Sequence, residues 1–172
     1  MAQAVVCIVR SEQVAQDIVD DLRVNGFAGD DISVLFPDRS GTRDFAHEKG
    51  TKAPEGATAG ATTGGVLGGA AGWLVGIGAL AIPGMGPFIA AGPIMAALSG
   101  AAVGAAAGGM TGALVGLGIP EYEAKQYEGK IRDGNILISV HAEDGDARRR
   151  AKDIFELHQA RDVSSARESR AS

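Results

Sequence analysis

The stretch from Gly56 to Pro120 most constrains how this chain can fold. It contains no Asp, Glu, Lys, Arg or His, and it holds most of the chain's 26 glycines. Ten of these glycines recur at every fourth position, in two sets of five. They are Gly60, Gly64, Gly68, Gly72, Gly76, Gly100, Gly104, Gly108, Gly112 and Gly116. Because four positions advance an α-helix by slightly more than one turn, each set would line one face of a helix.

Such a glycine face lowers the stability of a helix unless something offsets the cost. Each glycine costs about 1 kcal/mol relative to alanine. Close approach of two helix backbones offsets this cost where small residues repeat at every fourth position, in lipid or in a tight bundle. A flexible linker would instead be polar and rich in serine, whereas this stretch contains Trp73 and Phe88 and only one serine, Ser99. We therefore interpret the ten glycines as a surface for helix packing and oligomerisation.

The two sets of glycines also form an internal repeat. Residues Gly60–Gly78 match Gly100–Gly118 at every glycine of the two sets. Prolines and glycines between Pro83 and Pro87 predict a turn, and Pro93 is suited to the first position of a second helix. The predicted elements are a helix from Ala57 to Leu80, an apolar turn to Gly92, and a helix from Pro93 to Gly118.

A two-helix hairpin of this kind has two interpretations. Each predicted helix is long enough to cross a hydrocarbon layer of about 30 Å, so the hairpin could lie in a membrane. Alanine and glycine make it only mildly hydrophobic, so it could also be buried between subunits of a soluble homo-oligomer. Basic residues flank the stretch on both sides and none lies in the turn, so a membrane hairpin would place both termini in the cytoplasm. The expected partners are other copies of the chain and a lipid bilayer.

About 107 residues outside the stretch are enough for one modest domain. Their charge is roughly −4 before Gly56 and −1 after Pro120. No basic patch with interleaved aromatic residues is present, so we expect no nucleic-acid partner. The single cysteine, Cys7, excludes a disulfide framework and a thiolate metal cluster, and its apolar neighbours predict a thiol packed in the core.

The polar parts of the chain predict two segments, each of which contains both strands and a helix or helices. In the first, a strand at Ala4–Val9 precedes a helix that Ser11 caps and Gly26 ends, and a strand follows at Ile32–Phe36. In the second, Pro120 opens a helix with Tyr127 on its inner face, and Gly134 ends it. A strand follows at Ile136–Val140, and Asp144 or Asp146 caps a last helix. A short edge strand is predicted at Arg161–Ser164.

We therefore predict an α+β fold. It is a small ferredoxin-like βαβ…αβα(β) sandwich with helices on one face of the sheet, split by the two-helix Gly/Ala-rich hydrophobic hairpin. The predicted organisation is residues 1–55 as the N-terminal βαβ half plus a linker, 56–119 as the glycine hairpin, 120–165 as the C-terminal αβα(β) half, and 166–172 as a disordered tail.

No motif in the chain predicts catalysis. Gly76–Ala81 matches the pattern G-x-G-x-x-A, but no independent strand precedes it and no acidic residue follows at the required distance. His141 and Glu143 match half of a zinc deaminase motif without its cysteines. We expect no enzyme activity, no catalytic or metal-binding residues and no cofactor.

Several segments resemble one family of bacterial proteins. They are Val5–Val9, Gly29–Leu35, Gly118–Glu128 and Gly134–His141. In these segments the chain resembles the heat-induced general stress proteins of bacteria (the YflT, or general stress protein 17M, type), with the glycine stretch as an insertion. The resemblance covers most of the chain to about Val163. It implies a stress-related, non-enzymatic protein and supplies no catalytic residues.

These observations lead to one main hypothesis and two alternatives. The main hypothesis is a general stress-response protein that is membrane-associated and self-assembling through its glycine hairpin. The first alternative is a soluble structural homo-oligomer with hairpins buried between subunits. The second is a regulatory module that binds a small ligand on its sheet.

Overall fold

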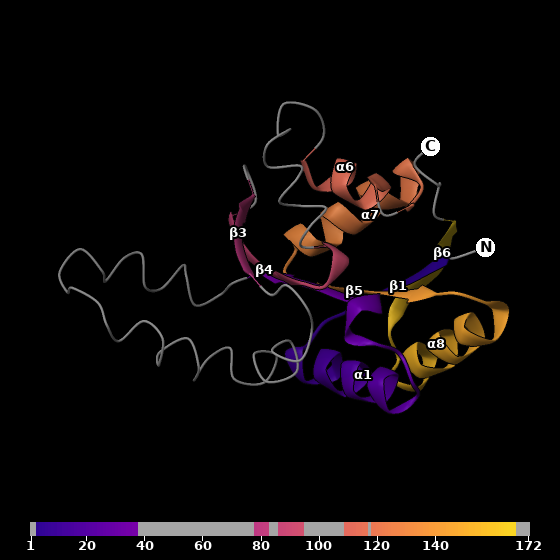
Figure 1. The fold of residues 1–172 in the computed structure, drawn as a ribbon. Coiled ribbons are helices and arrows are strands. Elements are labelled where there is room, and N and C mark those ends of the chain that lie inside the picture. The colour runs from indigo at the N-terminus through magenta and orange to yellow at the C-terminus, as the bar shows by residue number, and fades with distance from the viewer. Residues whose placement is uncertain (1–2, 38–77, 83–85, 95–108, 117, 168–172) are drawn as a thin grey trace.

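The fold is α+β, with an antiparallel sheet covered by helices on both faces (Figure 1). The computed structural model describes residues 3–37, 78–82, 86–94, 109–116 and 118–167. The strands are β1 (Gln3–Val9), β2 (Ile32–Pro37), β3 (Gly78–Ile82), β4 (Gly86–Ala91), β5 (Ile136–Ala142) and β6 (Arg161–Arg167). The helices are α1 (Glu12–Val24), the 3₁₀ turn η1 (Gly29–Asp31), α6 (Gly109–Gly116), α7 (Glu121–Arg132) and α8 (Gly145–Leu157). The six strands lie in the order β3-β4-β2-β5-β1-β6.

Local signals fix the ends of the helices outside the glycine stretch. The Ser11 hydroxyl accepts a hydrogen bond from the backbone N–H of Val14 at 3.2 Å and caps α1. The Asp144 carboxylate accepts the N–H of Ala147 at 2.7 Å and caps α8. Past the end of α1, Gly26 has a φ of +91°, a conformation that glycine adopts without strain. The predicted helices of these segments are confirmed, with α7 beginning directly after Pro120.

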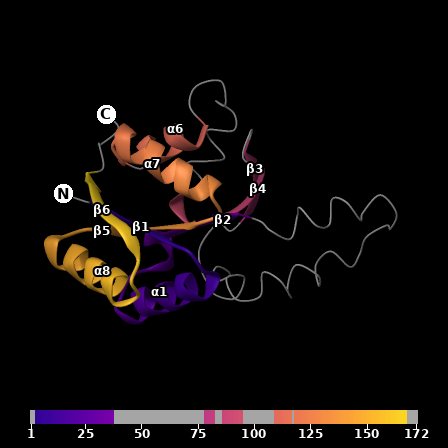
Figure 2. The same ribbon diagram turned by 180° about the vertical axis from the view of Figure 1, so that it is seen from behind.

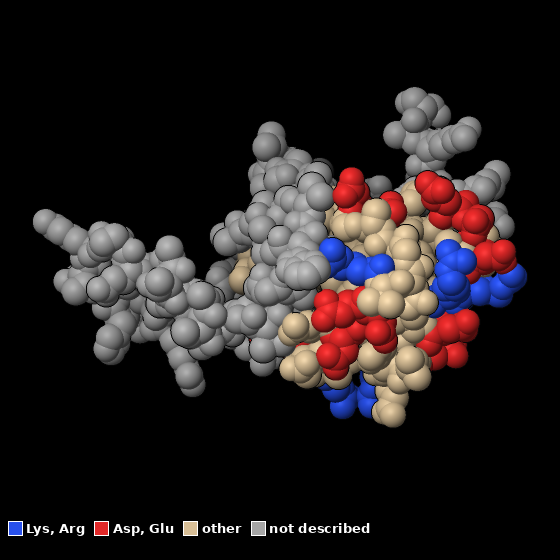
Figure 3. Space-filling model, turned by 60° about the horizontal axis from the view of Figure 1, so that its bottom comes forward, with Lys and Arg blue, Asp and Glu red and all other residues tan. Residues whose placement is uncertain are grey.

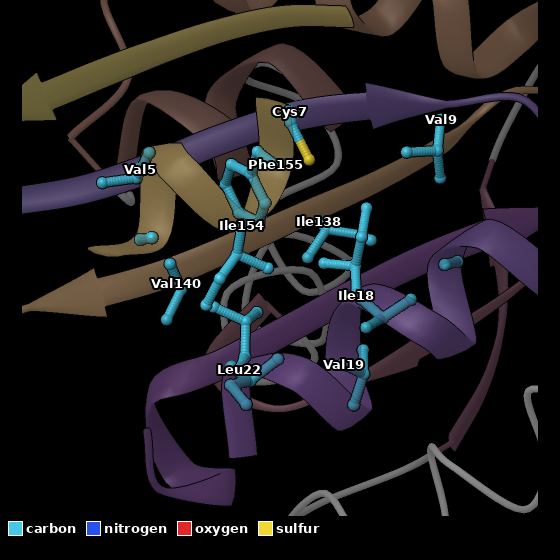
Figure 4. Close-up of a cluster of buried hydrophobic side chains, with 14 of the residues drawn as sticks. Val5, Cys7, Val9, Ile18, Val19, Leu22, Ile138, Val140, Ile154 and Phe155 are labelled. Atoms are coloured by element: carbon cyan, nitrogen blue, oxygen red, sulfur yellow. The ribbon is translucent and has the colours of Figure 1, made fainter. Parts of the chain in front are cut away.

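Helices α1 and α8 cover one face of the sheet (Figures 1 and 2). Alternate residues of β1, namely Val5, Cys7 and Val9, point into this layer. They pack with the apolar faces of both helices, and Figure 4 shows Ile18, Leu22 and Phe155 within the same cluster. Phe155, Ile18 and Leu22 are fully buried. This is the larger of the two hydrophobic clusters that the described residues form.

Helices α6 and α7 cover the opposite face (Figures 1 and 2). The other residues of β1, namely Ala4, Val6 and Ile8, point into this second cluster. The predicted placement of all helices on one face is therefore wrong. The reason is visible in β1, where every residue from Ala4 to Val9 is apolar and buried, because a strand that is apolar on both faces must be covered on both.

The glycine stretch contributes two strands where the sequence predicted none. β3 and β4 form an antiparallel hairpin, with Ile82 opposite Gly86, and β4 pairs with β2 along Val34–Pro37. The prediction of helix over Gly78–Leu80 and of an apolar turn up to Gly92 is therefore wrong. Short apolar runs bounded by glycine and proline suit strands better than helices. Residues 83–85 of the turn predicted between Pro83 and Pro87 lie outside the described residues, and Gly86 and Pro87 belong to β4.

Gly92 anchors the end of this hairpin against β2. Its φ is +83°, and a Cβ atom there would lie 2.0 Å from the carbonyl oxygen of Ile32. Only glycine allows this crossing of two backbones. Directly after it, Pro93 and Ile94 have helical conformation, as predicted for a helix that opens at Pro93.

The C-terminal edge strand is longer than predicted. β6 runs from Arg161 to Arg167 and pairs with β1, whose Gln3 lies opposite Arg167. The predicted tail therefore begins too early, because Ala166 and Arg167 belong to the strand. Residues 168–172 lie outside the described residues.

Candidate functional site: the outward face of helix α6

Of the ten glycines that the sequence marks for packing, two lie in the described chain. Gly112 and Gly116 both belong to α6. The other eight lie outside the described residues, as do most of the two predicted hairpin helices. In the ranges that the structure describes, we find no helix that combines the length and the apolar composition of a membrane span.

Helix α6 has a clear inside and outside. Met110 and Leu114, one helical turn apart, are 1% and 0% exposed and pack into the cluster on this face of the sheet. Gly112 is exposed, and a Cβ atom at this position would meet nothing within 4 Å. Val115 is also exposed. The glycine at position 112 is therefore not needed for packing within the described part of the chain.

Helix α7 holds α6 in this orientation. The Thr111 hydroxyl of α6 donates a hydrogen bond to the Glu128 carboxylate of α7. Arg132, one turn further along α7, pairs with the same carboxylate at 3.0 Å. On the inner side of α7, Ala124, Tyr127 and Ile131 are buried in the cluster that receives Leu114. The outward direction of Gly112 is thus set by contacts on both the polar and the apolar side of α6.

A polar cluster in turn ties α7 to the edge strand β6. The Tyr127 hydroxyl donates to the carbonyl oxygen of Asp162 at 2.7 Å and lies 2.8 Å from the Ser164 hydroxyl. Ser164 donates to the Glu123 carboxylate at 2.7 Å. Lys130 forms an ion pair with Asp162. These contacts join positions that are far apart in the sequence, and they fix α7 across the sheet.

The environment of Tyr127 changes its acidity. Burial raises its pKa from 10.0 to about 12, the Ser164 hydrogen bond opposes this rise, and the charges of Glu123 and Asp162 add to it. The neutral phenol is therefore the form that the folded chain favours.

A β-bulge places Asp162 for these contacts. The β1–β6 register shifts between Val6 and Ile8, which pair with Ser164 and Arg161. Two residues of β6 therefore lie opposite Cys7 alone. Asp162 has a φ of +53°, in the left-handed region that aspartate tolerates better than most residues. The bulge presents the Asp162 carbonyl to Tyr127 and its carboxylate to Lys130.

The opposite face of the sheet has no comparable uncharged exterior among the described residues. There His158 Nε2 lies 2.6 Å from the Asp21 carboxylate and joins α8 to α1. Cys7 is fully buried beneath these helices, and burial raises the pKa of its thiol well above the usual value. The prediction of a core thiol is confirmed.

The sequence predicted the position of Tyr127 on the inner face of α7 but not its polar partners. The partners come from β6, which was predicted only as a short edge strand. A tyrosine among apolar helix positions was the available signal, since a buried hydroxyl requires a hydrogen-bond partner. The identity of that partner depends on the bulge, and no local sequence pattern in Arg161–Ser164 predicts a bulge.

Comparison of the chain with models of known families, with curated proteins and with solved structures found no match. The resemblance to the general stress proteins therefore stays a prediction.

Proposed function

We propose that this chain is a non-enzymatic stress-response protein that assembles with copies of itself through the glycine-bearing part of its uncharged stretch. The observation that carries the proposal is the outward direction of Gly112, which no packing within the described chain requires. A glycine on an exposed helix face costs about 1 kcal/mol relative to alanine. Contact with another backbone at that face would offset the cost. The stress-response part rests on the resemblance of Gly118–Glu128 and Gly134–His141 to the family.

We further infer that the core is ferredoxin-like. The units β1-α1-β2 and β5-α8-β6 each place a helix on the same face of the sheet, and their strands lie in the order β6-β1-β5-β2 with antiparallel neighbours. This order supports the inference. The hairpin β3-β4 then extends the sheet beyond β2, and α6 and α7 form a second layer.

The lengths of the uncharged segments, and the points where the chain leaves and rejoins the sheet, favour contact between copies over a hairpin that spans a bilayer. The uncharged segment 56–77 is long enough for only one helical crossing, which takes about 20 residues. The chain enters this region from β2 and returns to the sheet at β3, so any crossings must be even in number. Residues 95–108 are shorter still, and both flanking segments pack on the same face of the sheet.

Attachment to a lipid bilayer is the second candidate function. The lack of any charge from Gly56 to Pro120 and the exposed Val115 on α6 favour an apolar surface as the partner. Attachment of this kind would keep both termini on one side, since the two ends of the described chain lie opposite each other in β1 and β6. Lipid would then contact the same outward face of α6.

The deciding experiment compares two glycines with similar surroundings. Gly112 lies on α6 and Gly129 on α7; both are exposed, and a Cβ atom at either would meet nothing within 4 Å. Gly112→Leu and Gly129→Leu would be made in the full chain, and the molar mass of each would be measured by light scattering after gel filtration without detergent. We expect the wild type and Gly129→Leu to form a discrete assembly and Gly112→Leu to fall to a smaller species.

Equal masses for all three proteins would contradict the proposed contact at α6. A monomeric wild type that floats with liposomes of neutral phospholipid would favour the bilayer candidate instead. In that case Gly112→Leu should bind the liposomes at least as well as the wild type, because leucine adds apolar area to the same face.

A further inference from the structure

A small pocket with both polar and apolar lining lies on the α6/α7 side of the sheet, away from the outward face of α6. Its volume is about 170 Å³. Its polar lining comes from η1, β2 and β5. The residues are Asp30, Asp31, Ser33, Ser139 and His141. Ala4 and Pro93 complete the wall with apolar surface.

The two serines differ in what they do. Ser33 and Ser139 face each other on neighbouring strands β2 and β5, and they are 3% and 6% exposed. The Ser33 hydroxyl accepts a hydrogen bond from the backbone N–H of Ile94 at 3.2 Å and so holds the chain after Gly92. No hydrogen bond joins the Ser139 hydroxyl to another described residue, and this hydroxyl lies at the pocket wall. The Ser139 hydroxyl is therefore open to a molecule bound in the pocket, since no described residue occupies it.

The charge of the pocket indicates the kind of partner. Two acidic residues, Asp30 and Asp31, line it together with His141, and no lysine or arginine of the described residues does. A primary ammonium group supplies three N–H donors and one positive charge. It therefore matches two carboxylates and the oxygen of a hydroxyl that has no other donor.

We propose that this pocket binds a small organic cation through a primary ammonium group. The carboxylates of Asp30 and Asp31 neutralise the charge of the ammonium group, and the Ser139 oxygen accepts one of its hydrogens. The apolar surface of Ala4 and Pro93 contacts the first methylene groups of the ligand. A metal ion fits less well, since no three His, Cys, Asp or Glu side chains of the described residues are grouped closely enough to hold one.

The test uses the full chain and 1,4-diaminobutane as the probe, with butane-1,4-diol as its uncharged match of the same length. Isothermal titration calorimetry at neutral pH should show saturable binding of the diamine at one site per chain and no binding of the diol. Asp31→Asn removes one charge and keeps the shape of the side chain, and it should weaken binding about tenfold or more. Ser139→Ala should weaken binding by about fivefold, because it removes one neutral acceptor.

The matched control is Asp20→Asn, which removes the same charge from an exposed position on α1, outside the pocket. It should change the affinity for the diamine by less than about twofold, since exposed charges at a distance are screened. The proposal is overturned if the diamine gives no saturable heat, if the diol binds equally well, or if Asp20→Asn and Asp31→Asn weaken binding equally. Thermal unfolding of each variant confirms that it is folded. The readout does not depend on assembly, so this outcome is separate from that of the proposed function.

Discussion

Helix α6 and the two helices on the opposite face of the sheet bury similar side chains but present different exteriors. On one face, α1 and α8 place acidic and basic residues toward solvent, and Figure 3 shows both signs of charge mixed over this side of the molecule. On the other face, α6 has no charged residue, and its exposed positions include Gly112 and Val115. Both layers nevertheless contribute fully buried residues, such as Phe155 below the sheet and Leu114 above it.

In most surface helices an apolar inner face and a charged outer face occur together. In α6 only the apolar inner face is present. Burial of Ile18 and Leu22 explains the inner face of α1, and charge explains its outer face in water. Burial of Met110 and Leu114 explains the inner face of α6 in the same way. Nothing within the described chain explains its outer face. Under the proposed function, this outer face is where copies of the chain would meet, so substitutions in the two layers should have different effects.

The largest expected effect lies where the uncharged stretch joins the sheet. Gly92→Ala would place a methyl group 2.0 Å from the Ile32 carbonyl oxygen, on a backbone with a φ of +83°. We expect a loss of about 4 kcal/mol or more in the free energy of unfolding, because neither backbone can yield without breaking the β2–β4 pairing. Urea unfolding measures the loss.

The matched control is Gly26→Ala. Gly26 has a similar φ of +91°, but a Cβ atom there would meet nothing within 4 Å. Gly26→Ala should cost only about 1 kcal/mol from the left-handed backbone. Equal losses in the free energy of unfolding for the two substitutions would show that Gly92 does not make its close contact with the backbone of β2.

The next prediction compares the two buried layers directly. Leu114→Ala should cost about 3 kcal/mol, and Phe155→Ala about 4 kcal/mol, because each leaves a cavity in a packed cluster. Chemical denaturation of each variant measures the two costs. A negligible cost for Leu114→Ala, beside a large one for Phe155→Ala, would mean that α6 does not belong to the folded core.

A pH-dependent loss of stability should mark the layer that holds α6. The pKa of Tyr127 is 10.0 in the unfolded chain and about 12 in the folded one. Its contribution to stability is therefore fully present below pH 10 and is lost as the pH rises from 10 to about 12. The loss is on the order of 2 kcal/mol once solvent screening is allowed for, and urea unfolding at pH 9 and pH 11.5 measures most of it.

Tyr127→Phe isolates this contribution. At pH 9 the variant should be less stable than the wild type by about 1 kcal/mol, because the hydrogen bonds to Asp162 and Ser164 are lost. The difference should shrink or reverse as the pH rises. A constant difference between the two proteins across this range would show that Tyr127 does not titrate as described.

The sequence predicted the layer of α1 and α8 well because its signals are local. Ser11, Gly26 and Asp144 stand at the helix ends that they determine, and apolar residues recur at helical spacing between them. The core position of Cys7 followed from its apolar neighbours in β1. In these segments each local preference agrees with the tertiary structure.

The same reasoning failed for Gly78–Ala91 because composition there carries little information. Glycine and alanine give no alternation that separates strand from helix, and the lack of charge removes the usual sign of an exposed face. Pairing with β2 decided the outcome, and that contact joins segments that are distant in the sequence. The pocket was missed for the same reason, since its residues come together only when η1, β2 and β5 are placed side by side.

The smallest expected effect separates the two roles of Gly112. Gly112→Ala adds a methyl group that meets nothing within 4 Å, so it should stabilise the fold of a single chain by up to about 1 kcal/mol through helix propensity. Gly129→Ala on α7 should give a similar gain for the same reason.

If α6 contacts another copy through a glycine face, only Gly112→Ala should also weaken assembly, because the methyl group separates the two backbones. Thermal unfolding at low and high protein concentration distinguishes these effects: Gly129→Ala should raise the midpoint at both, whereas Gly112→Ala should raise it at low concentration and lose the gain at high concentration. An equal rise for both variants at every concentration would show that the outward glycine of α6 has no partner.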